Sequence, residues 1–359
     1  MYPSEAHDEV KNLVHDDEVE ELKQCLPKDY IIGDLEIVKY QGFWCFADTN
    51  MFKSILMFQR HFQARESDLI VASFPKTGTT WLKSILYSVV NRFKHPIKQS
   101  PLLTNHPHEL VCRLEYDIYG DAFDYPRPHH LSELPSPRLF HTHLPYVTLP
   151  ESIKVSGCRI LYITRNPLDT LVSMMYFAMK PLKELVGEDV ELPSIEYYFE
   201  DFCEGKPGPF FEHVIEYWKQ SLEQPNKVLF LKYEELKEDP ILHLKRVAEF
   251  VDMPFTEIKE SEGVIEEIIE FCSINNLKEL EGNKNGVINK IYDKKSYFRK
   301  GEVGDWTNHS ITPVMVEKMK KLMQEKLEGT GLSFQLLPLF LTNSLMVIGK
   351  YKLYSLMLS

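Results

Sequence analysis

Asp68–Phe74 (DLIVASF) runs directly into Pro75–Trp81 (PKTGTTW), and this stretch decides the fold. The first segment is a short apolar run of the kind that forms a buried strand, and a helical pattern over Thr79–Phe93 follows the glycine turn. The start of such a helix presents unpaired backbone N–H groups and the positive end of the helix dipole. Both features suit a phosphate, so the sequence predicts a phosphate-binding loop between this strand and this helix.

The side chains of this loop also suit an anion. Lys76 adds a mobile cation, and three hydroxyls can donate hydrogen bonds to phosphate oxygens, those of Thr77, Thr79 and Thr80. The order of the Walker A motif, G-x-x-x-x-G-K-[ST], is absent because Lys76 precedes Gly78 instead of following it. The loop is therefore P-loop-like without the usual Mg²⁺-binding frame, which disfavours metal-dependent ATP hydrolysis. Taken alone, the string also fits an ordinary strand–turn–helix connection with a threonine cap.

Further strand-type runs alternate with helical patterns along the chain. The strand-type runs lie at 138–141, Arg159–Thr164 (RILYIT) and Lys227–Leu231 (KVLFL). Helical patterns lie near 168–179, in the segments up to about 280, and after the capping pair Thr312-Pro313. Short strands of the buried type alternating with helices predict an α/β fold with a mostly parallel central sheet flanked by helices on both faces.

The chain shows no linker, internal repeat or low-complexity stretch, so a single domain over 46–334 is expected. Residues 1–45 are expected to form an acidic, partly helical leader that ends in the aromatic segment 41–45 (QGFWC) and packs on this domain. Residues 335–359 form an apolar tail broken by Pro338, which fits either a packed or a disordered segment. The longest charge-free stretch of this tail is shorter than the roughly 20 residues of a membrane span, so no membrane anchor is expected.

The composition bounds the function. Of 359 residues, 41 are Lys or Arg and 53 are Asp or Glu, so the formal net charge is −12. An acidic chain argues against a general binder of nucleic acid or of anionic membranes, because such proteins carry basic surfaces. The six cysteines are far apart and form no CxxC pair, which favours free thiols in a reducing compartment. The leader lacks the apolar core of a secretory signal, so a cytoplasmic protein is expected.

With these motifs in place, the chain resembles the cytosolic sulfotransferases, whose phosphate loop reads P-K-[ST]-G-T-T-W. The likeness extends from about Asp68 to Phe334 and includes Tyr297–Trp306 (YFRKGEVGDW), which matches a second family signature. Members transfer a sulfuryl group from 3′-phosphoadenosine 5′-phosphosulfate (PAPS) to a hydroxyl of a small molecule. The resemblance implies the sulfotransferase fold, PAPS as co-substrate and no metal requirement.

Segment 41–45 resembles the plant branch of the family, which acts in secondary metabolism. That branch implies a phenolic, steroid or jasmonate-like acceptor, of the flavonoid, brassinosteroid, hydroxyjasmonate or desulfoglucosinolate type. The dimer motif of animal members, K-x-x-x-T-V-x-x-x-E after the tryptophan, is not matched, so a monomer is expected. At its places stand Thr307, Ile311, Thr312 and Val316.

Two polar residues follow the predicted strand 159–164. Arg165 ends this strand, and Ser173 lies eight residues on, about two turns into the next helix. This spacing lets the guanidinium and the hydroxyl converge on one anion at the carboxyl edge of the sheet, where open α/β sheets bind ligands. The resemblance implies that they hold the 3′-phosphate of PAPS, under a closing segment made of Arg299, Lys300 and Gly301. Taken singly, Arg165 also fits an ion pair, and the other charged residues fit a solvated surface.

The adenine of PAPS is expected to lie against aromatic side chains. Trp81 offers a flat ring for stacking, and Tyr233 resembles the family's adenine-contacting tyrosine. The family often has Thr-Ser-Phe where this chain has Cys272, Ser273 and Ile274. Ile274 packs instead of stacking and Cys272 is a poor hydrogen-bond donor, so a weaker adenine contact is expected.

Thr142–Pro145 (THLP) resembles the family's catalytic histidine segment. An alcohol or phenol must lose its proton as its oxygen attacks sulfur, and histidine has a pKa suited to that general-base role. The resemblance implies His143 as the base in an in-line transfer. It also implies that Lys76 neutralises charge on the oxygen between sulfur and the 5′-phosphate, with Ser173 as a third catalytic residue. The family often has lysine where this chain has His141, whose role stays open.

Other functions stay open at this point. One is a ligand-binding protein that keeps the fold and has lost turnover, which the changes at His141, Cys272 and Ile274 favour. Another is a P-loop kinase or NTPase, which the displaced lysine disfavours. A metal site is disfavoured because no cysteine or carboxylate stands at ligand spacing to the clustered histidines. Those histidines are His106, His108, His129, His130, His141 and His143.

Overall fold

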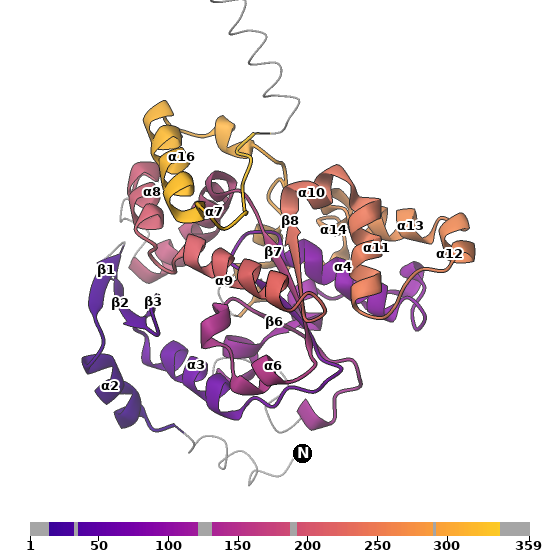
Figure 1. The fold of residues 1–359 in the computed structure, drawn as a ribbon, viewed down its shortest axis with the longest axis horizontal. Coiled ribbons are helices and arrows are strands. Elements are labelled where there is room, and N and C mark those ends of the chain that lie inside the picture. The colour runs from indigo at the N-terminus through magenta and orange to yellow at the C-terminus, as the bar shows by residue number, and fades with distance from the viewer. Residues whose placement is uncertain (1–13, 32–34, 121–130, 187–191, 290–291, 338–359) are drawn as a thin grey trace, which may run out of the picture.

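A computed structural model describes residues 14–31, 35–120, 131–186, 192–289 and 292–337. Five strands form a central sheet in the order β5-β6-β4-β7-β8, and all neighbours pair in parallel (Figure 1). The strands are β4 (Leu69–Ser73), β5 (Cys112–Arg113), β6 (Leu139–Thr142), β7 (Arg159–Thr164) and β8 (Val228–Lys232). The predicted parallel sheet is therefore confirmed. Strand β5 was not predicted, because two residues carry no periodicity.

Side chains of the sheet alternate between two hydrophobic cores, one on each face. Ile70 and Ala72 of β4 belong to the first core, whereas Leu69 and Val71 belong to the second. Every residue of β4 is buried, which explains why this strand reads as an unbroken apolar run. Figure 1 shows α3 and α9 on one side of the sheet and α4 and α11 on the other, so the predicted cover of both faces is confirmed.

The helices divide between the two cores. The first core is covered by α2 (Asp16–Gln24), α3 (Thr49–His61), α6 (Glu151–Val155), α7 (Pro167–Val186), α8 (Ile195–Cys203), α9 (Phe210–Glu223) and α16 (Pro313–Leu327). The second core is covered by α4 (Thr79–Asn91), α10 (Tyr233–Glu238), α11 (Pro240–Phe250) and α13 (Val264–Phe271). Shorter helices are α5 (Pro107–Leu110), α12 (Glu257–Ser261), α14 (Ile274–Leu277) and α15 (Glu281–Lys284). A π-helical turn, η4 (Leu114–Ile118), follows β5, and β9 (Val287–Ile288) pairs antiparallel with β10 (Tyr292–Asp293).

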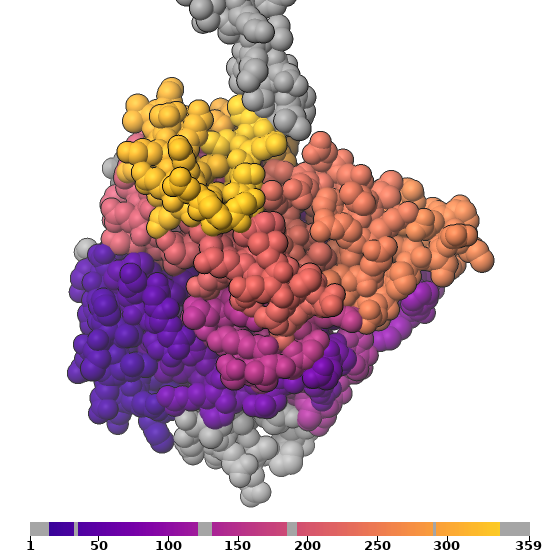
Figure 2. Space-filling model, in the orientation of Figure 1, coloured from indigo at the N-terminus to yellow at the C-terminus, as the bar shows by residue number. Residues whose placement is uncertain are grey.

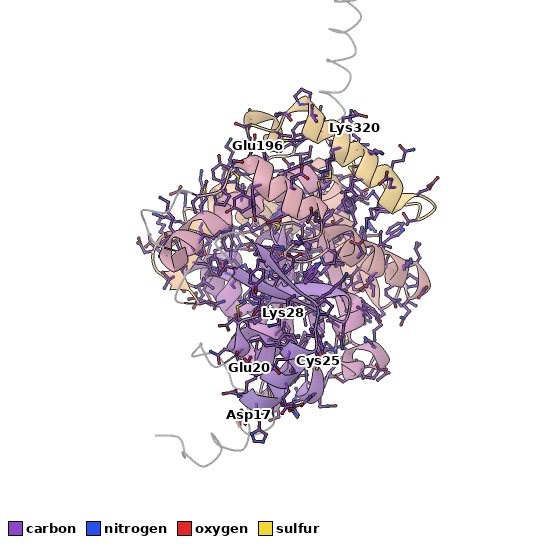
Figure 3. All side chains as sticks on the ribbon, turned by 90° about the vertical axis from the view of Figure 1, so that its left-hand side faces the viewer. Asp17, Glu20, Cys25, Lys28, Glu196 and Lys320 are labelled. Atoms are coloured by element: carbon purple, nitrogen blue, oxygen red, sulfur yellow. The ribbon has the colours of Figure 1, made fainter. Side chains whose placement is uncertain are left out.

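The N-terminal segment forms α2 and a three-stranded antiparallel sheet. Its strands are β1 (Lys28–Ile31), β2 (Leu35–Tyr40) and β3 (Phe43–Phe46). Val19 of α2 and Cys45 of β3 lie in the first core, and Lys23 donates a hydrogen bond to Thr49 of α3 at 3.1 Å. The helix of the leader was predicted, whereas the small sheet was not. Figure 3 shows Asp17 and Glu20 of α2 at the end of the molecule opposite Lys320 of α16.

The C-terminal helix α16 begins where the sequence predicts. Thr312 accepts the N–H of Met315 at 3.2 Å, and Met319 and Leu327 of this helix are buried. Beyond it, Trp306 Nε1 donates to the carbonyl of Leu336 at 2.7 Å, so the start of the apolar tail contacts the core. The remainder, 338–359, lies outside the described residues. Figure 2 shows the N-terminal and C-terminal segments, indigo and yellow, as separate areas of one face. Within the described part of the chain, none of the helices has the length and apolarity needed to span a membrane.

Candidate active site

The phosphate loop joins β4 to α4 through a sharply constrained glycine. Gly78 caps α4 with φ +116°, a conformation that side chains rarely adopt. A Cβ atom on Gly78 would lie 2.8 Å from Cδ2 of Tyr233 and 3.0 Å from Cδ1 of Ile163. The first turn of α4 therefore starts against the ends of β7 and β8, with its backbone N–H groups unpaired inside the helix.

Replacing Gly78 by alanine is expected to destabilise the protein more than a positive φ alone would. The left-handed backbone costs about 1–2 kcal/mol for an alanine, and overlap with the Tyr233 ring adds about 1–3 kcal/mol. Urea unfolding measures the loss in free energy of unfolding. Gly329→Ala is the control for the backbone cost alone, because Gly329 has φ +74° and open space around its Cβ position. Equal losses in the two variants would mean that the contact with Tyr233 does not constrain the loop.

The hydroxyls of the loop have partners inside the protein. Thr77 Oγ1 donates to the carbonyls of Phe74 at 2.7 Å and Ile163 at 2.9 Å. Its single hydrogen thus faces two acceptors inside the protein. Thr79 Oγ1 lies 2.7 Å from the hydroxyl of Ser73. The third hydroxyl, that of Thr80, also has a partner inside the protein, a ring nitrogen of a histidine on α5.

Lys76 lies over aromatic rings beside other cations. Its Nζ is 3.7 Å from the ring centroid of Phe177 on α7 and 5.4 Å from that of Tyr297. Burial, with the positive charges of Arg299 and Arg165, lowers the pKa of Lys76 to about 7. Three basic side chains that repel one another in one place create a site that an anion would stabilise.

The ring of His143 is fixed in one tautomer. Nδ1 lies 2.8 Å from the carbonyl oxygen of Ser73, which can only accept, so Nδ1 carries the proton and Nε2 keeps its lone pair. Burial lowers the pKa of His143 to about 3, and the charge of Arg113 acts in the same direction. The backbone is also held: its N–H donates to Glu115 at 2.8 Å and its carbonyl accepts from Nε2 of His213 at 3.1 Å. His143 is therefore a neutral imidazole of fixed orientation at the carboxyl end of β6.

Arg165 lies at the carboxyl end of β7, as the spacing predicted. It is 5% exposed, its guanidinium lies 4.7 Å from the ring of Tyr233, and it forms an ion pair with Asp169 at 3.1 Å. It also donates to the carbonyl of Glu302, whereas its buried Nε has no hydrogen-bond partner among the described residues. Ser173 stands one turn after Asp169 on α7 and is buried.

The segment 299–306 closes over Tyr233. The hydroxyl of Tyr233 donates to the carbonyl of Gly301 at 2.7 Å. Arg299 and Lys300 form ion pairs with Asp305, at 2.6 Å and 2.8 Å. Burial raises the pKa of Asp305, but hydrogen bonds from Lys300 and its other partners outweigh burial and hold that pKa well below its usual range. The two predicted cations are thus held together by one carboxylate.

The residues predicted for adenine are brought together only in part. The rings of Trp81 and Tyr233 lie 5.3 Å apart at 68°, and Ile274 lies so close to Gly301 that a Cβ there would be 2.7 Å from its Cδ1. Ser273 accepts a backbone N–H at the start of α14. The thiol of Cys272 is buried, and its Sγ lies 3.4 Å from the hydroxyl of Ser88 of α4.

Sequence reasoning missed Asp169, which joins three parts of the site. Besides its ion pair with Arg165, it accepts the N–H groups of Gly304 at 2.8 Å and Trp306 at 3.0 Å. The side-chain amide of Asn166 donates to it at 2.8 Å. Asp169 is 1% exposed and thus fixes the closing segment against α7. Its place in the first turn of a helix offered the only signal, that of an ordinary dipole-favoured acid.

A second missed group lies beneath the loop. Lys83 of α4 is fully buried, and its Nζ lies 2.9 Å from Nδ1 of His108, whose Nε2 lies 3.0 Å from the hydroxyl of Thr80. The rings of His106, His108, His141 and His143 follow one another at 5.2, 5.3 and 5.1 Å. His141 is buried, with Nδ1 3.3 Å from the carbonyl of Val111. The described residues include no cluster of three or more His, Cys, Asp or Glu placed to hold a metal ion, and His129 and His130 lie outside them.

Comparison with known proteins agrees with this geometry. Residues 66–331 match the sulfotransferase domain. The chain is 44% identical to cytosolic sulfotransferase 5 of Arabidopsis thaliana over 322 residues, which are 89% of this chain and 97% of that protein. It is also 44% identical to cytosolic sulfotransferase 8 of the same plant, over 88% of this chain and 93% of that one. These names agree with the cytosolic location expected from the leader.

A solved structure shows the same fold at moderate identity. Mouse sulfotransferase SULT7A1, complexed with PAP, has a TM-score of 0.62 and 30% identity over 82% of this chain and 94% of that chain. An Arabidopsis thaliana structure provisionally described as a steroid sulphotransferase has a TM-score of 0.67 and 34% identity, over 93% of this chain and 99% of that one. The phosphate loop, the signature at 297–306 and these relatives lead to one conclusion: the chain belongs to the sulfotransferase family.

Proposed function

We propose that this sulfotransferase transfers the sulfuryl group of PAPS to a hydroxyl of a small plant metabolite, with His143 as general base. One observation carries the proposal: the ring of His143 is neutral, and the proton on Nδ1 leaves the lone pair on Nε2, next to the strand that leads into the phosphate loop. The mouse relative solved with PAP, the nucleotide that remains after PAPS gives up its sulfuryl group, supports the choice of donor.

The donor would bind along the carboxyl edge of the sheet. Its 5′ end suits the backbone N–H groups that open α4, together with Lys76. Its 3′-phosphate suits Arg165 and Ser173, joined by the cations of the closing segment, which would exchange part of their contact with Asp305 for the phosphate. Its adenine suits the space around Trp81, Tyr233 and Ile274. Thr77 would contribute its N–H group, because its hydroxyl is already engaged.

The chemistry needs a base, charge neutralisation and alignment. Nε2 of His143 takes the proton of the acceptor hydroxyl while the oxygen forms its bond to sulfur. The bond between sulfur and the 5′-phosphate oxygen breaks in the same step, and Lys76 neutralises the charge on that oxygen. No covalent intermediate with the protein and no metal is required, so positioning and electrostatics supply the catalysis, as in phosphoryl transfer.

Donor binding is expected to take up a proton at Lys76. The pKa of Lys76 in the free protein is about 7, so above that pH the free amine predominates, while the phosphates of bound PAP favour the ammonium form. The Kd for PAP should therefore rise with pH between about 7 and 9, by up to tenfold per pH unit, and level off below 7. Calorimetry in buffers of different ionisation enthalpy measures the proton uptake, which should approach one near pH 8.

The control for this prediction is Lys76→Arg. A guanidinium stays charged over the whole range, so this variant should bind PAP with a flatter pH dependence and little proton uptake. If Lys76→Arg took up as many protons as the natural protein, the titrating group would be another residue.

Turnover is the direct test of the proposed function. The purified protein is incubated with PAPS and a panel of phenols, steroids and aliphatic alcohols, with and without Mg²⁺, and products are detected by mass spectrometry. Sulfated product without a metal requirement supports the proposal. Binding of PAP with no product from any acceptor would support a protein that binds the nucleotide and has lost turnover.

We also propose that 46–334 form a single domain that acts as a monomer, with 14–45 packed on it. The shared first core supports the domain, because Val19, Cys45 and Phe52 lie in it together with Trp306 and Phe334. The unmatched animal dimer motif supports the monomer. Light scattering after gel filtration tests it, and a mass of twice 42.1 kDa would contradict it.

A further inference from the structure

The carboxyl ends of the parallel strands form one row, and Arg113 lies at one end of this row. It is the last residue of β5, the edge strand, and pairs with His141 of β6. The sheet order places the carboxyl end of β5 beside that of β6, which carries His143, and on the far side of it from β7, which carries Arg165. Since the donor residues occupy the ends of β4, β7 and β8, the acceptor has to approach His143 from the side of β5.

The guanidinium of Arg113 has more donors than partners. Its Nη2 lies 3.5 Å from Oδ1 of Asp117, at the limit of a hydrogen bond, and its buried Nε has no partner among the described residues. The side chain remains 18% exposed. Asp117 already accepts the backbone N–H of Arg113 at 2.7 Å and the amide of Asn289 at 3.0 Å. An arginine carries five N–H donors, so most of this set is left for another acceptor.

The surroundings of Arg113 are aromatic. Its guanidinium lies 4.4 Å from the ring centroid of Tyr116. Phe177 and Tyr292 stack at 4.6 Å and 8°, and Tyr297 meets Phe177 at 4.9 Å. Phe177 also holds Lys76, so this aromatic group borders the reacting end of the site. Flat apolar walls with one cation beyond them match a ligand that has a hydrocarbon body and an acidic end.

Arg113 and His143 act on each other electrostatically. After burial, Arg113 is the largest influence that lowers the pKa of His143, so the two side chains share one electrostatic environment. Glu115 also faces this environment; burial raises its pKa, which favours its neutral form, and it is engaged by the N–H of His143. A cation this close to the base, with unused donors, is suited to bind an anion that arrives with the acceptor.

We propose that the acceptor is a hydroxylated carboxylic acid and that Arg113 binds its carboxylate while His143 faces its hydroxyl. This inference rests on the proposed function and names its substrate class. A carboxylate matches the planar fork of a guanidinium and makes short, charge-assisted hydrogen bonds. A neutral phenol or steroid would leave the unused donors of Arg113 without partners, which disfavours its binding.

Matched acids and esters test the inference. One phenolic and one aliphatic hydroxy acid are each compared with their methyl esters, which keep the reacting hydroxyl and remove the charge. The natural protein should show a kcat/KM about 10- to 100-fold higher for each acid than for its ester. In Arg113→Gln this ratio should fall to near one, mainly through the KM of the acid. Loss of the Arg113 charge also shifts the pKa of His143, but this acts on acid and ester alike and leaves the ratio unchanged. Arg113→Lys should restore part of the preference for the acid.

The controls separate the possible failures. Arg246→Gln, at a half-buried position of α11, should keep the natural ratio, and thermal unfolding of each variant checks that the fold is intact. If esters and simple phenols are sulfated at least as well as the acids, the inference is wrong and the proposed function stands. If Arg113→Gln lowers kcat/KM equally for acids and esters, Arg113 contributes to the site without binding the carboxylate of the acceptor. That result also overturns the inference. If nothing is sulfated although PAP binds, the proposed function itself fails.

Discussion

Replacing His143 by alanine is expected to lower kcat by about 10²–10⁴-fold while the Kd for PAP changes less than about threefold. The imidazole supplies the base for the acceptor proton, and its Nδ1–H donates to the backbone carbonyl of Ser73. The loss therefore falls on the chemical step. Initial rates with a saturating acceptor give kcat, and calorimetric titration with PAP gives the Kd.

Two further variants serve as controls for this prediction. His143→Gln retains most of the side-chain volume, so it separates loss of the base from a packing defect. His95→Ala, at an exposed position after α4, should leave both quantities unchanged. A parallel loss of kcat and PAP affinity in His143→Gln would contradict the assignment of His143 as the base.

The parts of the site that could be predicted from the sequence are those encoded by neighbouring residues. Strand β4, the phosphate loop and the start of α4 form one uninterrupted segment. The apolar run, the glycine and the threonines therefore predict this segment together. Arg165 and Ser173 lie at one strand end and on the helix that follows it, so their spacing in the chain is enough to predict that both stand at this edge of the sheet. Local contacts of this kind need no knowledge of the tertiary structure.

The missed parts depend on contacts between distant segments. Asp169 binds the N–H of Gly304, which lies 135 residues later, and no local pattern connects them. Lys83 reads as a polar position on α4, because lysine is rarely buried, yet it is fully enclosed against His108. The same limit applies to Arg113: an arginine in a two-residue edge strand has no sequence signal for the donors that it leaves unpaired.

The fold explains why these distant residues meet. All strands of the central sheet run parallel, so their carboxyl ends form one row in the order β5, β6, β4, β7 and β8. Arg113, His143, Ser73 and Arg165 take their places in that row from the strand that carries each of them. The order alone puts the base between the donor half and the edge strand. The order of the strands along the chain does not predict this arrangement. Strand β4 comes before β5 and β6 in the chain, but in the sheet it comes after both of them, counted from the edge strand β5.

Replacing Arg165 by alanine is expected to weaken PAP binding about 100-fold. Each hydrogen bond to a charged group contributes about 1.5–3 kcal/mol, and a guanidinium that grips a phosphate makes at least one such bond at full charge. The buried Nε of Arg165, which has no partner among the described residues, is a donor still available for that contact. Calorimetric titration of the natural protein and the variant gives the ratio of Kd values.

The ion pair with Asp169 offers the rival explanation, and the ligand itself can separate the two. Arg165→Ala leaves Asp169 without its cation at 3.1 Å, so a loss of stability is expected whatever Arg165 binds. Adenosine 5′-monophosphate lacks the 3′-phosphate and otherwise matches PAP. If Arg165 holds that phosphate, the variant should lose about 100-fold in affinity for PAP and little for adenosine 5′-monophosphate. If both nucleotides lose the same factor, Arg165 acts by holding Asp169 and the segment 299–306, and the 3′-phosphate has to be bound by other residues.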